Sequence, residues 1–203
     1  MTRNKEETKA RILAAVGKLL AESGFKSLGV NAIAREAGVD KVLIYIYFDG
    51  LPSLLKCYAR EGGYWMAPDE LIGDESAEVA ETQADWMVYL LLRFLNDLKE
   101  RPVTQEILRW ELLEGNSLTH ELANVRDQLG LNSLKFLEGK GSFPQDKDIP
   151  AISAILIAGV VYLLLRTKVS NSFMGLDFSS STGWQRVEAA LESIIQSTFL
   201  EIP

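Results

Sequence analysis

Apolar positions recur along most of the chain with the 3.6-residue period of an α-helix. In residues 5–23, Ile12, Val16 and Leu20 lie at i, i+4 and i+8 on one face, and charged side chains occupy the other faces. Gly24 follows at a position typical of a helix C-terminus. Further helices are predicted over 52–66, 84–101, 104–115, 117–141 (with a possible break at Gly130), 149–166 and 181–200. The pattern predicts an all-α fold.

A shorter pattern in GVNAIAREAGVDK (29–41) predicts two helices joined by a tight turn. Val30, Ile33 and Ala37 have helical spacing, and Gly38 follows as a helix end. Asp40 is a favourable N-cap for a second helix that begins immediately after it. A short helix, a turn containing Gly and a second helix form a helix-turn-helix.

The next seven residues, VLIYIYF (42–48), are all apolar or aromatic and favour a β-strand by propensity alone. No partner strand is evident nearby, and a single strand would leave its backbone groups unpaired. Because Asp40 can cap the segment and Gly50 can end it, we predict a helix with Ile44 and Phe48 facing the core. Tyr45 is expected at the boundary, and the remaining side chains point outward: Val42, Leu43, Ile46 and Tyr47.

The stretch GFKSLGVNAIAREAGVDKVLIYIYF (24–48) resembles the N-terminal DNA-binding domain of TetR/AcrR-type transcriptional regulators. The resemblance covers about a fifth of the chain and is carried by Gly24, Phe25, Val30, Ile33, Ala34, Ala37, Gly38, Val39, Tyr45, Phe48 and Leu54. It implies a homodimer with a helix-turn-helix domain over residues 1–50. It also implies a helical domain over 51–203 that dimerises and binds a small molecule, which releases a pseudo-palindromic DNA operator.

The expected DNA-reading surface departs from the family pattern by losing polar groups. Gly29 stands where Thr or Ser usually caps the second helix, Asn31 where Arg is common, and Leu51 where a Lys usually reaches a phosphate. The N-terminal arm retains positive charge in Arg3, Lys5, Lys9 and Arg11. The resemblance makes the following residues candidates for DNA binding: Ser27, Gly29, Asn31, Lys41, Val42, Leu43, Tyr45, Ile46 and Tyr47.

Two interpretations of this apolar surface remain open. Apolar side chains can contact thymine methyl groups in the major groove, so Val42, Leu43 and Ile46 suggest a weaker or thymine-biased operator contact. Alternatively, some of them pack within the domain. The same loss of polar groups also allows a different function, that of a helical ligand-binding or interaction protein whose DNA binding has weakened or disappeared.

The run IPAISAILIAGVVYLLLR (149–166) is near the lower length limit of a membrane span. A helix that is apolar on all sides can also be buried between its own core and a partner subunit, and this is the interpretation we favour. In the resembled family the last two long helices form the dimer interface, so the resemblance implies that the amphipathic segment 181–200 joins 149–166 there. The interface candidates are Ala151, Ala154, Ile155, Ala158, Tyr162, Trp184, Val187, Leu191, Ile194 and Ile195.

The effector site is predicted from large aromatic residues on the central helices, with a few polar residues to orient a ligand. The alternative for each aromatic residue is ordinary core packing. The candidates are Trp86, Tyr89, Phe94, Trp110, Glu111, Glu114, Phe136, Tyr162 and Arg166.

Composition limits the other classes of function. The chain has 203 residues, of which 47% are hydrophobic, and its net charge is −7. Residues 1–66 carry ten Lys or Arg and seven Asp or Glu, so a basic module precedes an acidic body that includes an acidic loop at 68–78. With Cys57 and His120 as the only Cys and His, a disulfide within the chain or a zinc module is excluded. We expect a cytoplasmic protein with no cofactor, no metal and no catalytic site.

Overall fold

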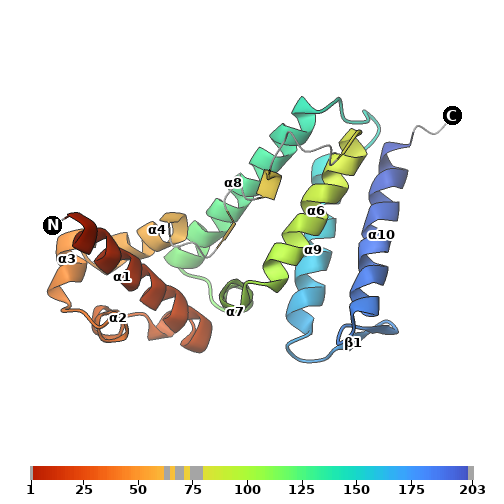
Figure 1. Cartoon of the computed structure of the whole chain (residues 1–203). Helices are drawn as coiled ribbons and strands as arrows, with labels where there is room; N and C mark the ends of the chain where they lie inside the picture. The colour runs from red at the N-terminus through yellow and green to blue at the C-terminus, as the bar shows by residue number, and fades with distance from the viewer. Residues whose placement is uncertain (1, 62–64, 67–70, 74–79, 201–203) are drawn as a thin grey trace. The chain divides into compact units, whose positions relative to one another are not determined.

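Most of the described residues lie in helices, which confirms the all-α prediction. The structure, a computed structural model, describes residues 2–61, 65–66, 71–73 and 80–200, without the side chains of residues 2 and 3. Most of the predicted acidic loop, the end of the helix predicted over 52–66 and the Arg3 side chain lie outside this part. The helices are α1 (Thr2–Ser23), η1 (Phe25–Ser27), α2 (Val30–Ala37), α3 (Val42–Phe48), α4 (Leu51–Glu61), α6 (Gln83–Lys99), α7 (Pro102–Glu111), α8 (Ser117–Gly139), α9 (Ile149–Arg166) and α10 (Ser181–Phe199) (Figure 1).

The contacts divide the chain into two compact units. The first unit comprises Met1–Ala67 and Arg101–Leu129, and the second comprises Pro68–Glu100 and Gly130–Pro203. By packing, therefore, α4, α7 and the first half of α8 belong with the helix-turn-helix. The functional boundary predicted at residue 50 stays a prediction.

The first unit is built on a core contributed by α1, α2, α3 and α4. Ile12, Leu20, Ile33, Ile44 and Leu54 are fully buried in it. The run 42–48 is a helix, as predicted. Ile44 and Phe48 on one face of this helix pack into the core, and the opposite face is exposed to solvent. α7 completes the unit by packing against α1.

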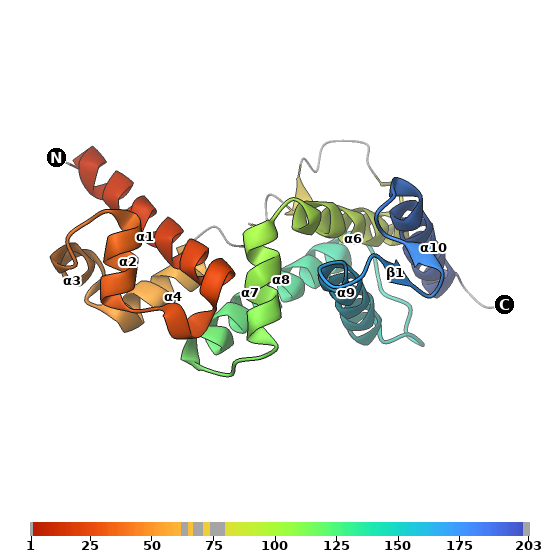
Figure 2. The same cartoon turned by 90° about the horizontal axis from the view of Figure 1, so that it is seen from below.

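The second unit contains α6, α9 and α10, which lie side by side in both views (Figures 1 and 2). α6 begins with a capping box: the Thr82 hydroxyl accepts from the Asp85 amide at 3.1 Å, and the Asp85 carboxylate accepts from the Thr82 amide at 3.0 Å. The Gln196 amide donates to the same carboxylate at 2.7 Å, which ties α10 to the start of α6.

The elements depart from the predictions in three details. α7 begins at Pro102 rather than at Thr104, because Pro is favourable in the first turn of a helix. Of the two alternatives at 117–141, one helix or two, the structure has one: α8 continues through Gly130. A two-stranded hairpin of β1 (Ser172–Phe173) and β2 (Leu176–Asp177), which the helical pattern did not predict, joins α9 to α10.

Candidate nucleic-acid interface and effector site

The helix α3 turns one apolar face into the core and presents another to solvent. Ile44 and Phe48 are buried, whereas Val42, Tyr45 and Ile46 are 52%, 57% and 65% exposed. The outward residues lie at i, i+3 and i+4, which places them on one side of the helix. Leu43 is half-buried.

The two tyrosines next to Ile46 exchange the places predicted for them. Tyr45 is exposed rather than at the boundary, because it lies one turn from Val42 on the outward face. Tyr47 is half-buried against the core rather than pointing outward, because it lies one turn from Ile44. The Lys5 ammonium lies 5.6 Å from the Tyr47 ring centre.

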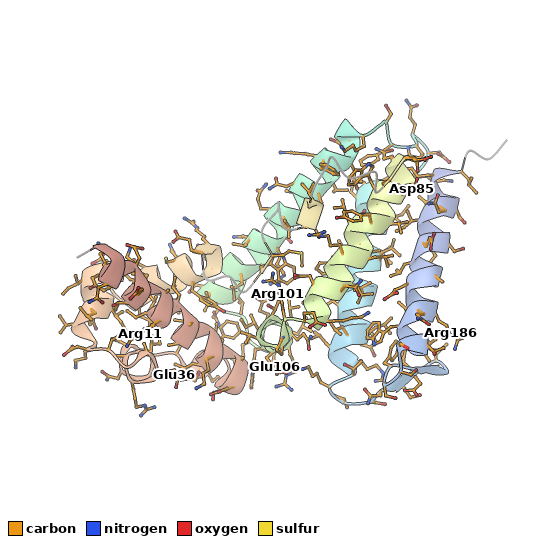
Figure 3. The ribbon with its side chains drawn as sticks, in the orientation of Figure 1. Arg11, Glu36, Asp85, Arg101, Glu106 and Arg186 are labelled. Carbon is orange, nitrogen blue, oxygen red and sulfur yellow. The ribbon has the colours of Figure 1, made fainter. Side chains whose placement is uncertain are left out.

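Backbone contacts hold the turn that positions α3. Gly38 adopts a left-handed conformation (φ 63°), and the Val39 amide donates to the Ala34 carbonyl at 3.0 Å. The Asp40 carboxylate accepts from the Val42 amide at 2.8 Å, while the N-cap of α3 is Lys41, one residue later than predicted. Arg11, labelled in Figure 3, donates to the Ala37 carbonyl at 2.6 Å. Arg11 therefore braces the turn, a role that the predicted cationic arm did not include.

The remaining DNA-binding candidates differ in side-chain exposure and in hydrogen bonding within the domain. Lys41 and Asn31 are exposed. The Ser27 hydroxyl lies 2.7 Å from the Gly24 carbonyl, to which it donates. Gly29 is the N-cap of α2 and supplies no side-chain cap. The exposed polar side chains around α3 are thus Lys41, Asn31 and the nearby Lys5, together with the carboxylates Asp40 and Asp49 at its ends.

Trp110 and Glu111 lie where α7 meets the rest of the first unit. Glu111 forms an ion pair with Arg126 of α8 at 2.6 Å, and its side chain is only 7% exposed. Burial raises the pKa of Glu111, and the Arg126 guanidinium opposes that rise. Glu111 Oε1 and Trp110 Nε1 are buried without a hydrogen-bond partner among the described residues. Sequence reasoning missed Arg126, because no local pattern links it to Glu111.

Trp110 also contacts the end of α1. A Cβ atom placed on Gly24 would lie 2.8 Å from Trp110 Cδ2, so the indole packs directly on this glycine. Glu114 lies in the turn after α7, where its amide donates to the Trp110 carbonyl at 2.9 Å. These effector candidates therefore surround a joint between α1, α7 and α8.

Three other aromatic candidates meet in the second unit. Trp86 packs edge-on against Tyr89 and Phe136, with ring centres 5.6 and 5.2 Å apart. Lys140 lies 4.7 Å from the ring centres of both Trp86 and Phe136. Phe94 is buried further along α6. The cluster has the contacts of a packed core, which was the alternative to ligand lining.

Tyr162 and Arg166 of α9 contact the hairpin. Their distances to the Phe173 ring centre are 5.8 Å from the Tyr162 ring centre and 5.0 Å from the Arg166 guanidinium carbon. Tyr162 is 53% exposed, which suits a surface that meets a partner better than the lining of an enclosed site.

α9 and α10 differ in how much of their apolar surface is exposed to solvent. Only 22% of α9 is buried within the chain, and Ala151, Ala154, Ile155, Ala158 and Tyr162 are all exposed. On α10, Ile194 is 48% exposed and Trp184 is half-buried. Val187, Leu191 and Ile195 are instead buried in their own subunit, so these predicted interface residues are already covered within one chain.

The helix-turn-helix segment matches a known protein family. Residues 12–55, from α1 to α4, match the family described as bacterial regulatory proteins, tetR family. This match assigns the helix-turn-helix segment, residues 12–55, to that family. No curated protein sequence matches the chain.

Solved structures show that the TetR fold extends over the whole chain. A protein from Rhodococcus sp., described as a TetR-family transcriptional regulator, is 19% identical with a TM-score of 0.68, and the alignment covers 96% of this chain and 100% of that one. GusR from Salmonella enterica is 18% identical, with a TM-score of 0.67 and 95% coverage of both chains. A TetR-family regulator from Marinobacter aquaeolei VT8 is 17% identical, with a TM-score of 0.63 and coverage of 97% and 98%.

Two further findings concern metal binding and membrane insertion. Within the described ranges, no three His, Cys, Asp or Glu side chains gather in a way that could hold a metal ion. α9 is long and apolar enough to cross a membrane by length and composition alone.

Proposed function

We propose that the protein is a ligand-responsive transcriptional regulator that binds a specific DNA sequence and acts as a repressor released by a small molecule. The observation that carries this proposal is the orientation of α3 after the turn at Gly38. This helix is fixed on its inner face and presents its other face, with Lys41 and Asn31 nearby, as a recognition helix must. TetR-family regulators bind DNA operators and small-molecule effectors and act as dimers.

The dimer is proposed to form through the exposed apolar face of α9, with Ile194 of α10 beside it. A second copy of the chain would cover Ile155, which is 71% exposed, and the small residues next to it. The opposite face of α9 already packs against α6, so α9 is not surrounded by lipid on all sides. Burial of the exposed face against a partner subunit is therefore favoured over insertion into a bilayer. Two copies of α3 would then read a pseudo-palindromic operator on one side of the duplex.

The effector is proposed to act on the first unit around Trp110, Glu111 and Arg126. Two buried polar atoms without partners, on Trp110 and Glu111, are available to a ligand there. A ligand that prefers one arrangement of α7 would change the packing of Trp110 on Gly24 at the end of α1. Release of DNA requires that the effector bind more tightly to the arrangement that does not fit the operator.

Fluorescence anisotropy tests the proposal directly. The purified protein is titrated onto the DNA upstream of its own gene and onto a scrambled duplex of the same composition, over a series of salt concentrations. The proposal predicts tight binding to the upstream DNA and weak, steeply salt-dependent binding to the scrambled one. Equal and weak binding to both, and to duplexes from the neighbouring genes, contradicts it.

The second candidate function is a ligand-binding or interaction protein of the same fold that has lost DNA reading. The apolar outward face of α3 favours it, because phosphate contacts supply most of the affinity for DNA. Ile46→Arg separates the two. A gain from weak to strong binding supports a degraded reader, whereas selective binding by the unaltered protein rules it out.

A further inference from the structure

The outward face of α3 needs a partner that its own subunit does not provide. Val42, Tyr45 and Ile46 are more than half exposed on one side of the helix, while Ile44 and Phe48 fill the core from the other side. Three neighbouring apolar or aromatic side chains on a domain whose other surfaces are mostly charged indicate a contact surface.

This face has little capacity for hydrogen bonding to bases. Among the exposed side chains of residues 41–48, only the Tyr45 phenol and the Lys41 ammonium can form hydrogen bonds. Base pairs in the major groove are usually read by bidentate Arg, Asn or Gln side chains, and none of these lies on α3. The groove feature that an aliphatic side chain can read is the 5-methyl group of thymine.

We propose that α3 reads its operator through thymine methyl groups, with Val42 and Ile46 as the specificity-determining residues. The inference rests on the proposed function, because it requires α3 to enter the major groove. Val42 and Ile46 are one helical turn apart, about 5–6 Å between Cβ atoms. Successive base pairs are about 3.4 Å apart along the duplex. The pair therefore fits methyl groups on adjacent or next-adjacent base pairs of each half-site.

The charges around the face favour DNA over a protein partner. Lys41 precedes Val42, and Lys5 is held near α3 by its contact with the Tyr47 ring. Two exposed carboxylates lie at the ends of α3: Asp40 accepts from the Val42 amide, and Asp49 is the C-cap residue. The lysines can contact DNA phosphates while the neighbouring apolar side chains contact thymine methyl groups. The phosphate contacts position the helix, and the methyl contacts specify the sequence.

Deoxyuridine substitution tests this inference, because uracil lacks only the 5-methyl group and keeps every hydrogen-bonding group of thymine. An operator is first selected from a random duplex pool with the full-length protein. Anisotropy then compares the selected duplex with copies in which individual thymines are replaced. We expect about fourfold weaker binding for each contacted methyl, and about tenfold or more when both half-sites are changed. Uracil in the flanking sequence should have no effect.

Variants assign the effect to the proposed residues. In Ile46→Ala, or in Val42→Ala, the penalty for uracil should disappear at the position that residue contacts and persist elsewhere. Lys41→Ala is the matched control: it should weaken binding to every duplex, lower the dependence on salt and leave the uracil penalties unchanged. All three residues are exposed, so thermal unfolding should be nearly unaffected and serves as the check on folding.

The possible failures are distinguishable. Selective binding that tolerates uracil at every thymine, or a selected operator without thymine in its half-sites, overturns the inference and leaves the proposed function standing. No sequence preference in the selection overturns both.

Discussion

At the scale of single residues, Gly24 links the helix-turn-helix to α7. It has a left-handed backbone (φ 73°) and accepts the Trp110 indole where a side chain would otherwise be. The sequence predicted a helix end at Gly24 from the residue type, but it did not show that Trp110 requires the glycine. That second requirement comes from a contact between residues far apart in the sequence, which no local pattern encodes.

We therefore expect Gly24→Ala to destabilise the protein by about 2–4 kcal/mol, from left-handed strain and the clash with Trp110 combined. Chemical unfolding in urea measures the change. Gly115→Ala is the control, because a Cβ atom there would meet nothing within 4 Å. Equal effects of the two substitutions would show that the Trp110 contact is not a constraint.

The buried Glu111–Arg126 ion pair gives a second prediction at this scale. Arg126→Met removes the cation and leaves a buried carboxylate, so it should cost about 3 kcal/mol of unfolding free energy at pH 8. Because burial raises the pKa of Glu111, the folded state holds the proton more tightly than the unfolded chain. The penalty should therefore shrink as the pH falls toward the unfolded value of about 4.3.

Urea unfolding at a series of pH values checks this, with the double variant Glu111→Gln/Arg126→Met as the control. The double variant should lack the added pH dependence of the single one. A penalty in Arg126→Met that is constant from pH 8 to pH 5 would show that Glu111 is not its source.

At the scale of elements, the sequence predicted most helices because caps and periodicity agree there. The run 42–48 is a helix in spite of its β propensity, as Asp40 and Gly50 predict. Its cap residues lie one position inside those two, at Lys41 and at Asp49, which is left-handed. Gly130 does not break α8, because the cost of about 1 kcal/mol for one interior glycine is small beside the packing of a long helix. The hairpin after α9 escaped prediction because its two-residue strands are too short to show alternation.

The start of α6 allows a test at the same scale. Asp85 completes the capping box and accepts from Gln196, and hydrogen bonds from Thr82 and Gln196 lower its pKa. Asp85→Ala should destabilise the protein by about 1 kcal/mol at neutral pH.

A lowered pKa means that the contribution of Asp85 is present above the unfolded value of about 3.9 and is lost as the pH falls through the folded value. The difference between wild type and Asp85→Ala should therefore narrow in acid. Urea unfolding at pH 7 and below pH 4 measures it, with the exposed Asp127→Ala on α8 as control. A difference that persists unchanged in acid would show that the charge of Asp85 plays no part.

At the scale of the whole molecule, the sequence showed which helices are apolar but not which side of each one is covered. Val187, Leu191 and Ile195 of α10 pack inside the subunit, whereas the equally apolar α9 keeps one face open. Likewise, the aromatic residues chosen for an effector site divide into a packed cluster around Trp86 and a polar joint around Trp110. Periodicity places a residue on a face, and only tertiary packing decides what meets that face.

The open face of α9 predicts a dimer. Sedimentation equilibrium should give the mass of two 22.6 kDa chains for the wild type and a shift toward one chain for Ile155→Asp, because a charge in a covered apolar interface is costly. Val169→Asp alters another exposed apolar residue, outside the helix, and should leave the dimer intact. A monomeric wild type, or equal dissociation by both variants, would argue against this interface.

Hydroxyl-radical footprinting on the selected operator tests the central claim most directly, because it reports where the protein lies on the duplex. Two copies of α3 in a dimer predict two protected stretches on one side of the DNA, related by two-fold symmetry and separated by about 10 base pairs or a multiple of that distance. A single unsymmetrical stretch, or weak protection without boundaries, would contradict a dimeric regulator that reads DNA through α3.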